Sequence, residues 1–85
     1  MKHFTNPSFH ECYNRLPRTV QKLADKNFEL LKSDPNYPSL HLKKVGKYWS
    51  IRIGKSYRAL AVEVDKGLIW FWVGSHAEYD RLLKK

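Results

Sequence analysis

The chain has 85 residues, 42% hydrophobic and 14% aromatic, which is enough for one globular domain and too few for two. Its 16 Lys and Arg residues exceed its 8 Asp and Glu residues, and the resulting net charge of +8 predicts nucleic acid or an acidic protein as the partner. Cys12 is the single cysteine, which excludes a disulfide framework and fits a reducing compartment. Neither a secretion signal nor an apolar span is recognisable, so we expect a cytoplasmic protein.

The first third of the chain predicts two helices. Asn6 followed by Pro7 is typical of a helix start and predicts a short helix over 7–15. From Pro17 to about residue 33, apolar residues recur at helical spacing, which predicts a second and longer helix. Pro35 and Pro38 disfavour helical backbone at the residues before them, so the helical region is expected to end there.

Residues 40–74 alternate between apolar and polar side chains, which predicts a meander of about four antiparallel strands. In "YWSIRIG", Trp49, Ile51 and Ile53 fall on one face, and polar or basic residues fall on the other. The short segments "GKS" and "DKG" predict hairpin turns between strands. We therefore expect one α+β domain over 1–85, in which an N-terminal helical hairpin covers one face of the sheet and a short helix ends the chain.

The face of this sheet turned away from the helices collects candidate binding residues. They are His41, Lys43, Tyr48, Ser50, Arg52 and, in the expected register, Arg58. A merely solvated basic face explains the pattern equally well. However, Arg52 and Arg58 flank the tight "GKS" turn, and two neighbouring arginines repel each other unless an anion such as phosphate lies between them. Trp70 and Trp72 are expected to share a face of the last strand, either as stacking surfaces for bases or as core.

The C-terminal segment combines a helix start with a histidine. Ser75 and Glu78 have the spacing of a capping box, which predicts a helix from His76 to about Leu83. His76 is then either an ordinary residue of the first helical turn or a proton donor and acceptor at the end of the last strand. Tyr79 is either a second polar group beside it or a packing residue. The histidines lack metal-ligand spacing and no nucleophile motif is present, so any catalysis is expected to be acid/base chemistry without a metal or cofactor.

The segment "LHLKKVGKYWSIRIGKSYRALAVEVDKGLIWFWVGSHAEYDRLL" resembles the RelE/ParE superfamily of bacterial toxins. Within it, "WSIRIGKSYRAL" looks like the strand-turn-strand element ending in Tyr-Arg, and "VGSHAEYDRLL" looks like the last strand and catalytic tail. The chain is similar to a subgroup of about this length with "PSL", "YRALA", "WFW" and the ending "GSH-x-EYDRL". The resemblance implies the RelE/ParE fold, here without the leading strand that is common in the family.

For RelE-type members, the resemblance implies a ribosome-dependent, metal-independent endoribonuclease that cleaves mRNA through attack by the RNA 2'-hydroxyl. Such a reaction needs a group that accepts the hydroxyl proton, cations that stabilise the phosphate, and an acid for the leaving 5'-oxygen. The matching positions imply Arg58 as phosphate clamp, Arg52 as its assistant, His76 as acid or base and Tyr79 as an aromatic that orients RNA. His41 and Lys43 are implied either to contact the substrate or to supply the other proton-transfer group. Tyr48 and Ser50, which the strand pattern places on the same face, are also expected to contact the substrate.

Two other functions stay open at this point. A ParE-like toxin would inhibit DNA gyrase by binding, without catalytic residues, and an inactive RelE-fold module would only bind RNA or a protein. Both toxin interpretations imply an acidic antitoxin, encoded by the adjacent gene, that folds on the basic surface. The expected partners are thus a cognate antitoxin, mRNA and the ribosome, with no membrane and no metal.

Overall fold

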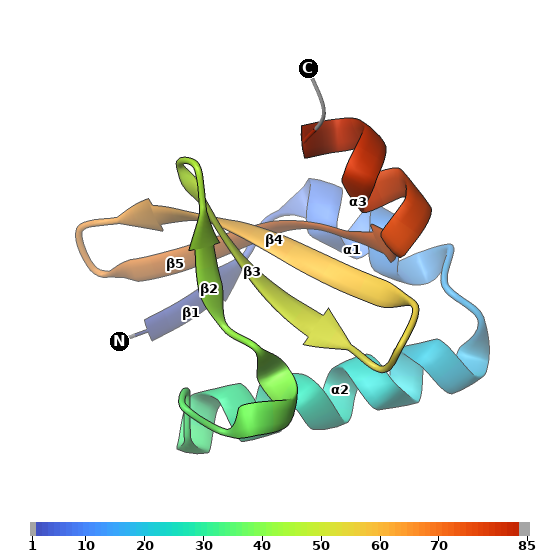
Figure 1. Ribbon diagram of the computed structural model, residues 1–85, viewed down its shortest axis with the longest axis horizontal. Helices are drawn as coiled ribbons and strands as arrows, with labels where there is room; N and C mark the ends of the chain where they lie inside the picture. The colour runs from blue at the N-terminus through green and yellow to red at the C-terminus, as the bar shows by residue number, and fades with distance from the viewer. Residues whose placement is uncertain (1, 84–85) are drawn as a thin grey trace.

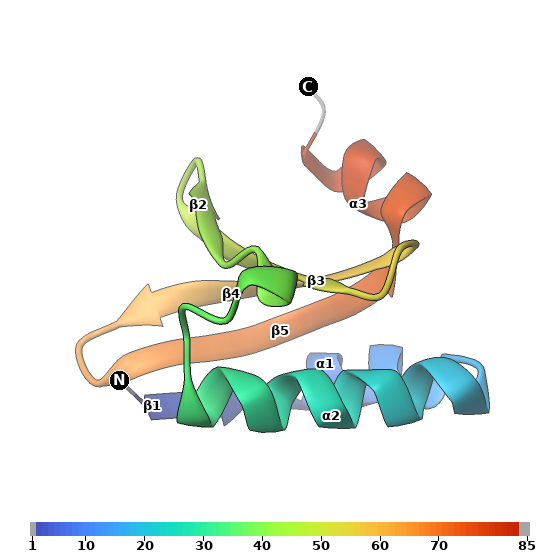
Figure 2. The ribbon, with the colours of Figure 1, turned by 60° about the horizontal axis from the view of Figure 1, so that its bottom comes forward.

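The computed structural model describes residues 2–83, which form an α+β domain with a five-stranded sheet (Figure 1). In chain order the elements are β1 (Lys2–Thr5), α1 (Pro7–Asn14), α2 (Arg18–Ser33), a short 3-10 helix η1 (Pro38–Leu40), β2 (Lys43–Val45), β3 (Tyr48–Ile53), β4 (Tyr57–Val64), β5 (Gly67–Ser75) and α3 (His76–Leu83). Figure 2 shows α1 and α2 beneath one face of the sheet, with the β2–β3 hairpin and α3 rising from the other. The predicted class and the helical hairpin on one face are confirmed.

The strand order across the sheet is β1-β5-β4-β3-β2, and β1 is parallel to β5 while the other pairs are antiparallel. The prediction of about four strands with no leading strand is therefore wrong. Strand β1 is only four residues long and mostly exposed, so it carries no apolar alternation that would mark it. Its stability comes from pairing with Gly67–Trp70, a partner more than sixty residues away in the chain.

The strand region predicted over residues 40–74 begins later than expected, because residues 40–42 ("LHL") are not in a strand. Leu40 ends the 3-10 helix η1 and is fully buried, and His41 follows with a positive φ of 48°. Only Lys43–Val45 pairs with β3. His41 consequently lies in a left-handed turn next to the sheet rather than in a strand.

The core lies between the two N-terminal helices and the sheet. Asn6 caps α1 as predicted, since its Oδ1 accepts a hydrogen bond of 3.0 Å from the backbone N–H of Phe9. Leu31 of α2 and the strand residues Ile51 and Ile53 are fully buried in one hydrophobic cluster. The predicted inward face of β3 is therefore confirmed. Helices α1 and α2 do not cover the opposite face of the sheet (Figure 2).

A β-bulge interrupts the pairing of β4 with β5. Leu60 pairs with Trp72 and Ala61 with Trp70, so Phe71 is an extra residue between them. Trp70 is fully buried on the helix side, with its ring centroid 5.3 Å from that of Phe28. Trp72 lies on the face of its partner Leu60, so the prediction that the two tryptophans share a face is wrong, and the bulge is the reason.

Among the helices in residues 2–83, none has the length and apolar character needed to cross a membrane.

Candidate functional site

The open face of the sheet, which α1 and α2 leave uncovered, carries a pair of arginines from adjacent strands. Arg52 of β3 is the direct cross-strand partner of Arg58 of β4, which confirms their predicted proximity. Gly54, with φ of 62°, supplies the left-handed backbone that the tight turn between these strands requires. Like charges directly opposite each other are destabilising in a sheet. The fold thus concentrates positive charge at one point of the open face.

Arg58 is the more buried member of the pair, with 9% of its surface exposed. Its guanidinium carbon lies 5.0 Å from the centroid of the Tyr79 ring, within the range of a cation–π contact. Within residues 2–83, no group accepts a hydrogen bond from its buried Nε or Nη1. Because an unpaired buried donor costs free energy and a guanidinium matches the oxygens of phosphate, Arg58 is suited to bind an oxyanion.

His76 begins α3 directly after β5. Its backbone N–H donates to the carbonyl oxygen of Ser56 at 2.6 Å, which attaches the helix start to the β3–β4 turn. The predicted capping box is confirmed, since the Glu78 N–H donates to Ser75 Oγ at 3.2 Å and the Ser75 N–H donates to Glu78 Oε1 at 3.1 Å. The start of α3, including the backbone of His76, is therefore fixed by the bond to the β3–β4 turn and by the capping box.

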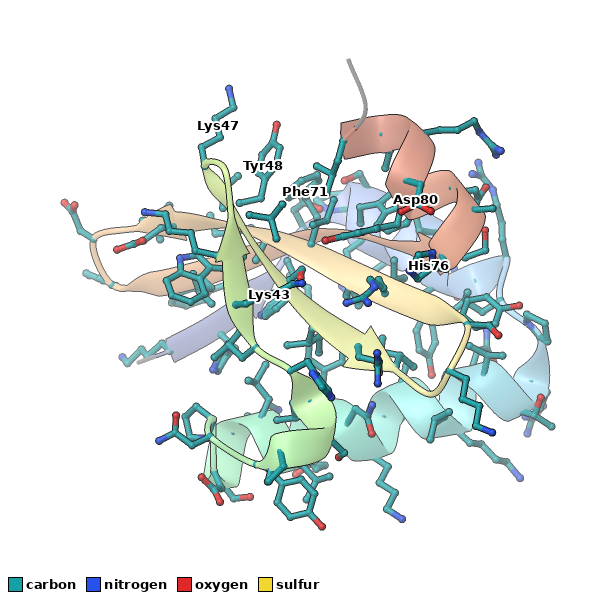
Figure 3. The ribbon with its side chains drawn as sticks, viewed as in Figure 1. Lys43, Lys47, Tyr48, Phe71, His76 and Asp80 are labelled. Atoms are coloured by element: carbon teal, nitrogen blue, oxygen red, sulfur yellow. The ribbon has the colours of Figure 1, made fainter. Side chains whose placement is uncertain are left out.

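The His76 side chain is 47% exposed, and its Nδ1 lies 3.1 Å from Oδ2 of Asp80 (Figure 3). A carboxylate at Nδ1 orients the imidazole ring and leaves Nε2 as the nitrogen that can meet a ligand. The histidine thus reaches solvent in a defined orientation. The sequence left open whether His76 is an ordinary residue of the first helical turn or a proton donor and acceptor. Its exposed and oriented side chain is compatible with proton transfer.

Tyr79 connects the arginine to the histidine. Its ring contacts the Arg58 guanidinium on one side, and its centroid lies 5.9 Å from that of the His76 ring. Only 8% of Tyr79 is exposed, so of its two predicted roles the structure favours packing. Tyr79 is a positioning residue that holds Arg58 and borders His76.

The remaining predicted residues differ in their exposure to solvent. His41 is exposed, with Nε2 3.4 Å from Nη1 of Arg52, and its left-handed backbone is a conformation that clusters at functional sites. Lys43 is exposed opposite Ser50 on β3, and Tyr48 is half-buried. Ser50 is 0% exposed, so the prediction that it contacts substrate is corrected: its hydroxyl lies beneath the surface of the open face.

Two residues of this face, Asp80 and Phe71, are not among those predicted from the sequence. Asp80 has a recognisable signal, because residues four apart on a helix are neighbours and His76 begins the predicted helix. Phe71 follows the inward-facing Trp70 and so reaches the open face by ordinary alternation, but the sequence pattern alone does not show which face of this strand is covered.

The donors of the site are nitrogen atoms of arginine, lysine and histidine. In the part of the chain that the structure describes, no group of three or more His, Cys, Asp or Glu side chains is placed to hold a metal ion.

Several solved structures have a fold similar to that of this chain. A chain of the RelB–RelE antitoxin-toxin complex from Methanococcus jannaschii matches with a TM-score of 0.67 and 21% identity, over 92% of this chain and 96% of that chain. The isolated E. coli RelE toxin matches with a TM-score of 0.63 and 14% identity, over 94% and 93%. The Helicobacter pylori protein HP0894 matches with 0.60 and 22%, over 91% and 96%. The fold is that of the RelE toxins.

The sequence itself establishes the family. The model of the ParE-like toxin domain matches residues 18–81, which is most of the chain. No curated protein sequence matches significantly. The chain belongs to the ParE-like toxin family, and with its fold to the RelE/ParE superfamily of toxins.

Proposed function

We propose that this protein is the RelE-like toxin of a type II toxin-antitoxin system and that it cleaves mRNA on the ribosome without a metal ion. The observation that carries the proposal is the cluster of Arg58, Tyr79 and His76. It combines a buried guanidinium with unpaired donors and an exposed, oriented imidazole. An anion-binding cation beside a titratable group is what cleavage of a phosphodiester requires.

The reaction would proceed by transfer of the phosphate ester within the RNA. The 2'-oxygen forms a bond to the adjacent phosphorus, and the bond from phosphorus to the 5'-oxygen breaks. Arg58, assisted by Arg52, stabilises the charge on the non-bridging oxygens, as bidentate guanidinium groups do. His76 transfers a proton through Nε2, either from the 2'-hydroxyl or to the leaving 5'-oxygen, while Asp80 holds Nδ1.

The second proton-transfer group in this proposal is His41. It lies at the other end of the arginine pair from His76, next to Arg52. Lys43, exposed on the same face, contacts the RNA backbone. Tyr79 contributes by positioning Arg58 rather than by stacking on RNA, because it is almost fully covered.

We also propose a cognate antitoxin, encoded by the adjacent gene, as the partner that silences the toxin in the cytoplasm. A net charge of +8 favours an acidic segment that folds on the toxin surface. The similar fold in a RelB–RelE antitoxin-toxin complex supports such a partner.

The proposed cleavage is tested on translating ribosomes. We expect the wild-type toxin to produce new mRNA ends, mapped by primer extension, and His76→Ala to lower the single-turnover rate constant by at least about 100-fold, because general acid–base catalysis contributes that much. His10→Ala is the matched control, since His10 is an exposed histidine of α1 on the other side of the sheet, and it should keep the wild-type rate. Undiminished cleavage by His76→Ala would remove the mechanism.

Expression of the protein in growing cells separates the other functions. Growth arrest with intact mRNA and accumulated DNA breaks would replace the proposal with gyrase inhibition. Harmless overexpression with salt-sensitive RNA binding would replace it with a binding module, because phosphate contacts weaken steeply as salt rises.

A further inference from the structure

A second feature of the open face lies beyond the arginine pair, between the tip of the β2–β3 hairpin and the end of α3. It is a groove of about 400 Å³ lined by Val45, Gly46, Lys47, Tyr48, Leu82 and Leu83. Figure 3 shows Lys47 and Tyr48 at the hairpin tip, with Phe71 between the hairpin and α3. None of the proposed chemistry uses this groove.

The aromatic residue of the groove is Tyr48, and its ring packs against Phe71 of the neighbouring part of the sheet. The ring centroids of Tyr48 and Phe71 are 5.3 Å apart, at an interplanar angle of 55°. Phe71 lies on the open face because it follows Trp70, which points to the helix side of the same strand. Phe71 thus supports the Tyr48 ring and leaves it half-buried, with part of the ring exposed.

The charge around the Tyr48 ring is positive. Nζ of Lys47 lies 5.8 Å from the ring centroid, and none of the residues within 2–83 that line the groove carries a carboxylate side chain. A planar aromatic surface beside a lysine matches a nucleotide, whose base stacks and whose phosphate pairs with the cation. An apolar side chain of a protein partner would contact the walls of the groove, but it would not pair with the positive charge of Lys47.

We propose that this groove is a nucleobase slot, in which one base of a single-stranded RNA stacks on Tyr48 and the adjoining phosphate pairs with Lys47. The choice of RNA rests on the proposed function, because the slot continues the face that holds Arg52 and Arg58. Tyr48 and Arg52 point to the same face of β3 and are four residues apart, about 13 Å along the strand. One RNA strand with its reacting phosphate at the arginines reaches the slot through a neighbouring nucleotide.

The slot is tested by RNA binding in the absence of cleavage. Fluorescence anisotropy with a labelled single-stranded RNA, in a His76→Ala background, should show that Tyr48→Leu weakens affinity about tenfold, which equals about 1.4 kcal/mol, within the range for stacking of one base. Tyr48→Trp should keep the affinity, because it retains an aromatic face. Phe4→Leu is the matched control, since Phe4 is an exposed aromatic residue of β1 at the far edge of the sheet.

An abasic scan of the RNA identifies the base that enters the slot. At one position, removal of the base should weaken RNA binding by the protein that retains Tyr48. The same removal should not change the RNA affinity of the Tyr48→Leu variant, because both changes remove the same contact. A wild-type measurement needs no substitution: 5-bromouracil at that position should crosslink to Tyr48 on irradiation, as mapped by mass spectrometry. A uniform effect of Tyr48→Leu on all abasic RNAs, or no crosslink, would overturn the slot.

The outcomes for the slot and for the proposed function are distinct. Base-dependent binding through Tyr48 without any cleavage on ribosomes keeps the slot and removes the nuclease. Cleavage by the wild type with unchanged RNA affinity of Tyr48→Leu removes the slot and keeps the nuclease. If Tyr48→Leu keeps RNA affinity and loses affinity for the antitoxin, the groove binds a protein and the nucleobase proposal is wrong.

Discussion

For a single residue, Arg58 has an environment that opposes folding more than it favours it. It lies opposite another arginine, it is almost fully covered, and two of its nitrogen atoms have no acceptor in residues 2–83. The face of Tyr79 offsets part of this cost through a cation–π contact. A buried charge without a hydrogen-bonded partner nevertheless destabilises the folded state.

Arg58→Met is therefore expected to raise the free energy of unfolding, by about 1–3 kcal/mol, because it removes a buried unpaired charge while an apolar side chain still packs on Tyr79. Equilibrium urea denaturation measures the change, and mRNA cleavage should be lost in the same variant. Arg52→Met is the control for charge alone, since Arg52 is more exposed and should change stability less. A destabilised Arg58→Met protein would show that the arginine is mainly structural.

At the scale of the element, α3 presents His76 and Asp80 to the open face and Tyr79 to Arg58. It is only eight residues long, and an isolated helix of that length does not form in water. Its stability comes from the capping box of Ser75 and Glu78, the backbone bond from His76 to Ser56, and the burial of Tyr79. The geometry of the site thus depends on how well this helix is capped.

Ser75→Ala should lower the free energy of unfolding by about 1 kcal/mol, because it removes the side-chain acceptor for the Glu78 N–H. Ser75→Asp retains an acceptor and should behave like the wild type. Urea denaturation measures stability, and amide hydrogen exchange over residues 76–83 reports whether α3 opens more often. Equal exchange rates in both variants would mean that packing of Tyr79 alone holds the helix.

At the scale of the whole molecule, β1 closes one edge of the sheet and joins the start of the chain to its last strand. The join includes a side-chain contact, because Nε1 of Trp70 donates a hydrogen bond of 3.1 Å to Nδ1 of His3. Burial lowers the pKa of His3 below its usual 6.5, and nearby positive charges, including that of Lys32, act in the same direction. His3 accepts this bond only when its Nδ1 carries no proton.

The stability of the molecule should consequently depend on pH through His3. Since the folded pKa lies below 6.5, the unfolded chain binds more protons between the folded value and 6.5, so stability is complete above that pH and falls as the pH is lowered through the window. His3→Asn keeps an acceptor for Trp70 but does not titrate. The difference in unfolding free energy between wild type and His3→Asn, measured by urea denaturation from pH 8 to pH 5, should therefore shrink or reverse at low pH.

That comparison accounts for the other titrating groups near His3, because they are present in both proteins. The cavity that His3 lines also contains His10, Asp25, Glu29 and Lys32. A difference that stays constant over the whole pH range would show that His3 does not titrate in this window.

Most element boundaries follow from interactions between residues close in the chain. The start of α1 at Asn6 and Pro7, the length of α2, the two hairpin turns and the capping box of α3 agree with the sequence patterns. The arginine pair was also predictable, because a tight turn places residues on adjoining strands opposite each other. Local patterns suffice for these features since the contacts that stabilise them span only a few residues.

Where a side chain points, by contrast, depended on partners far away in the chain. Trp72 is turned to the open face by a bulge whose position is set by the register with β4, and β1 exists only because β5 offers it an edge. Ser50 has the alternation of a surface residue and is nevertheless fully buried.

Composition and short-range periodicity carry enough information to predict the charge, the helical hairpin, the strand pattern and the resemblance to RelE/ParE toxins. The tertiary structure adds two features that sequence patterns do not contain. Arg58 is buried against Tyr79 with unpaired donors, and Phe71 packs against the Tyr48 ring beside the groove. These features arise where separate elements pack together. A one-residue change of register turns a strand side chain to the other face, so the site exists only once the strands have paired.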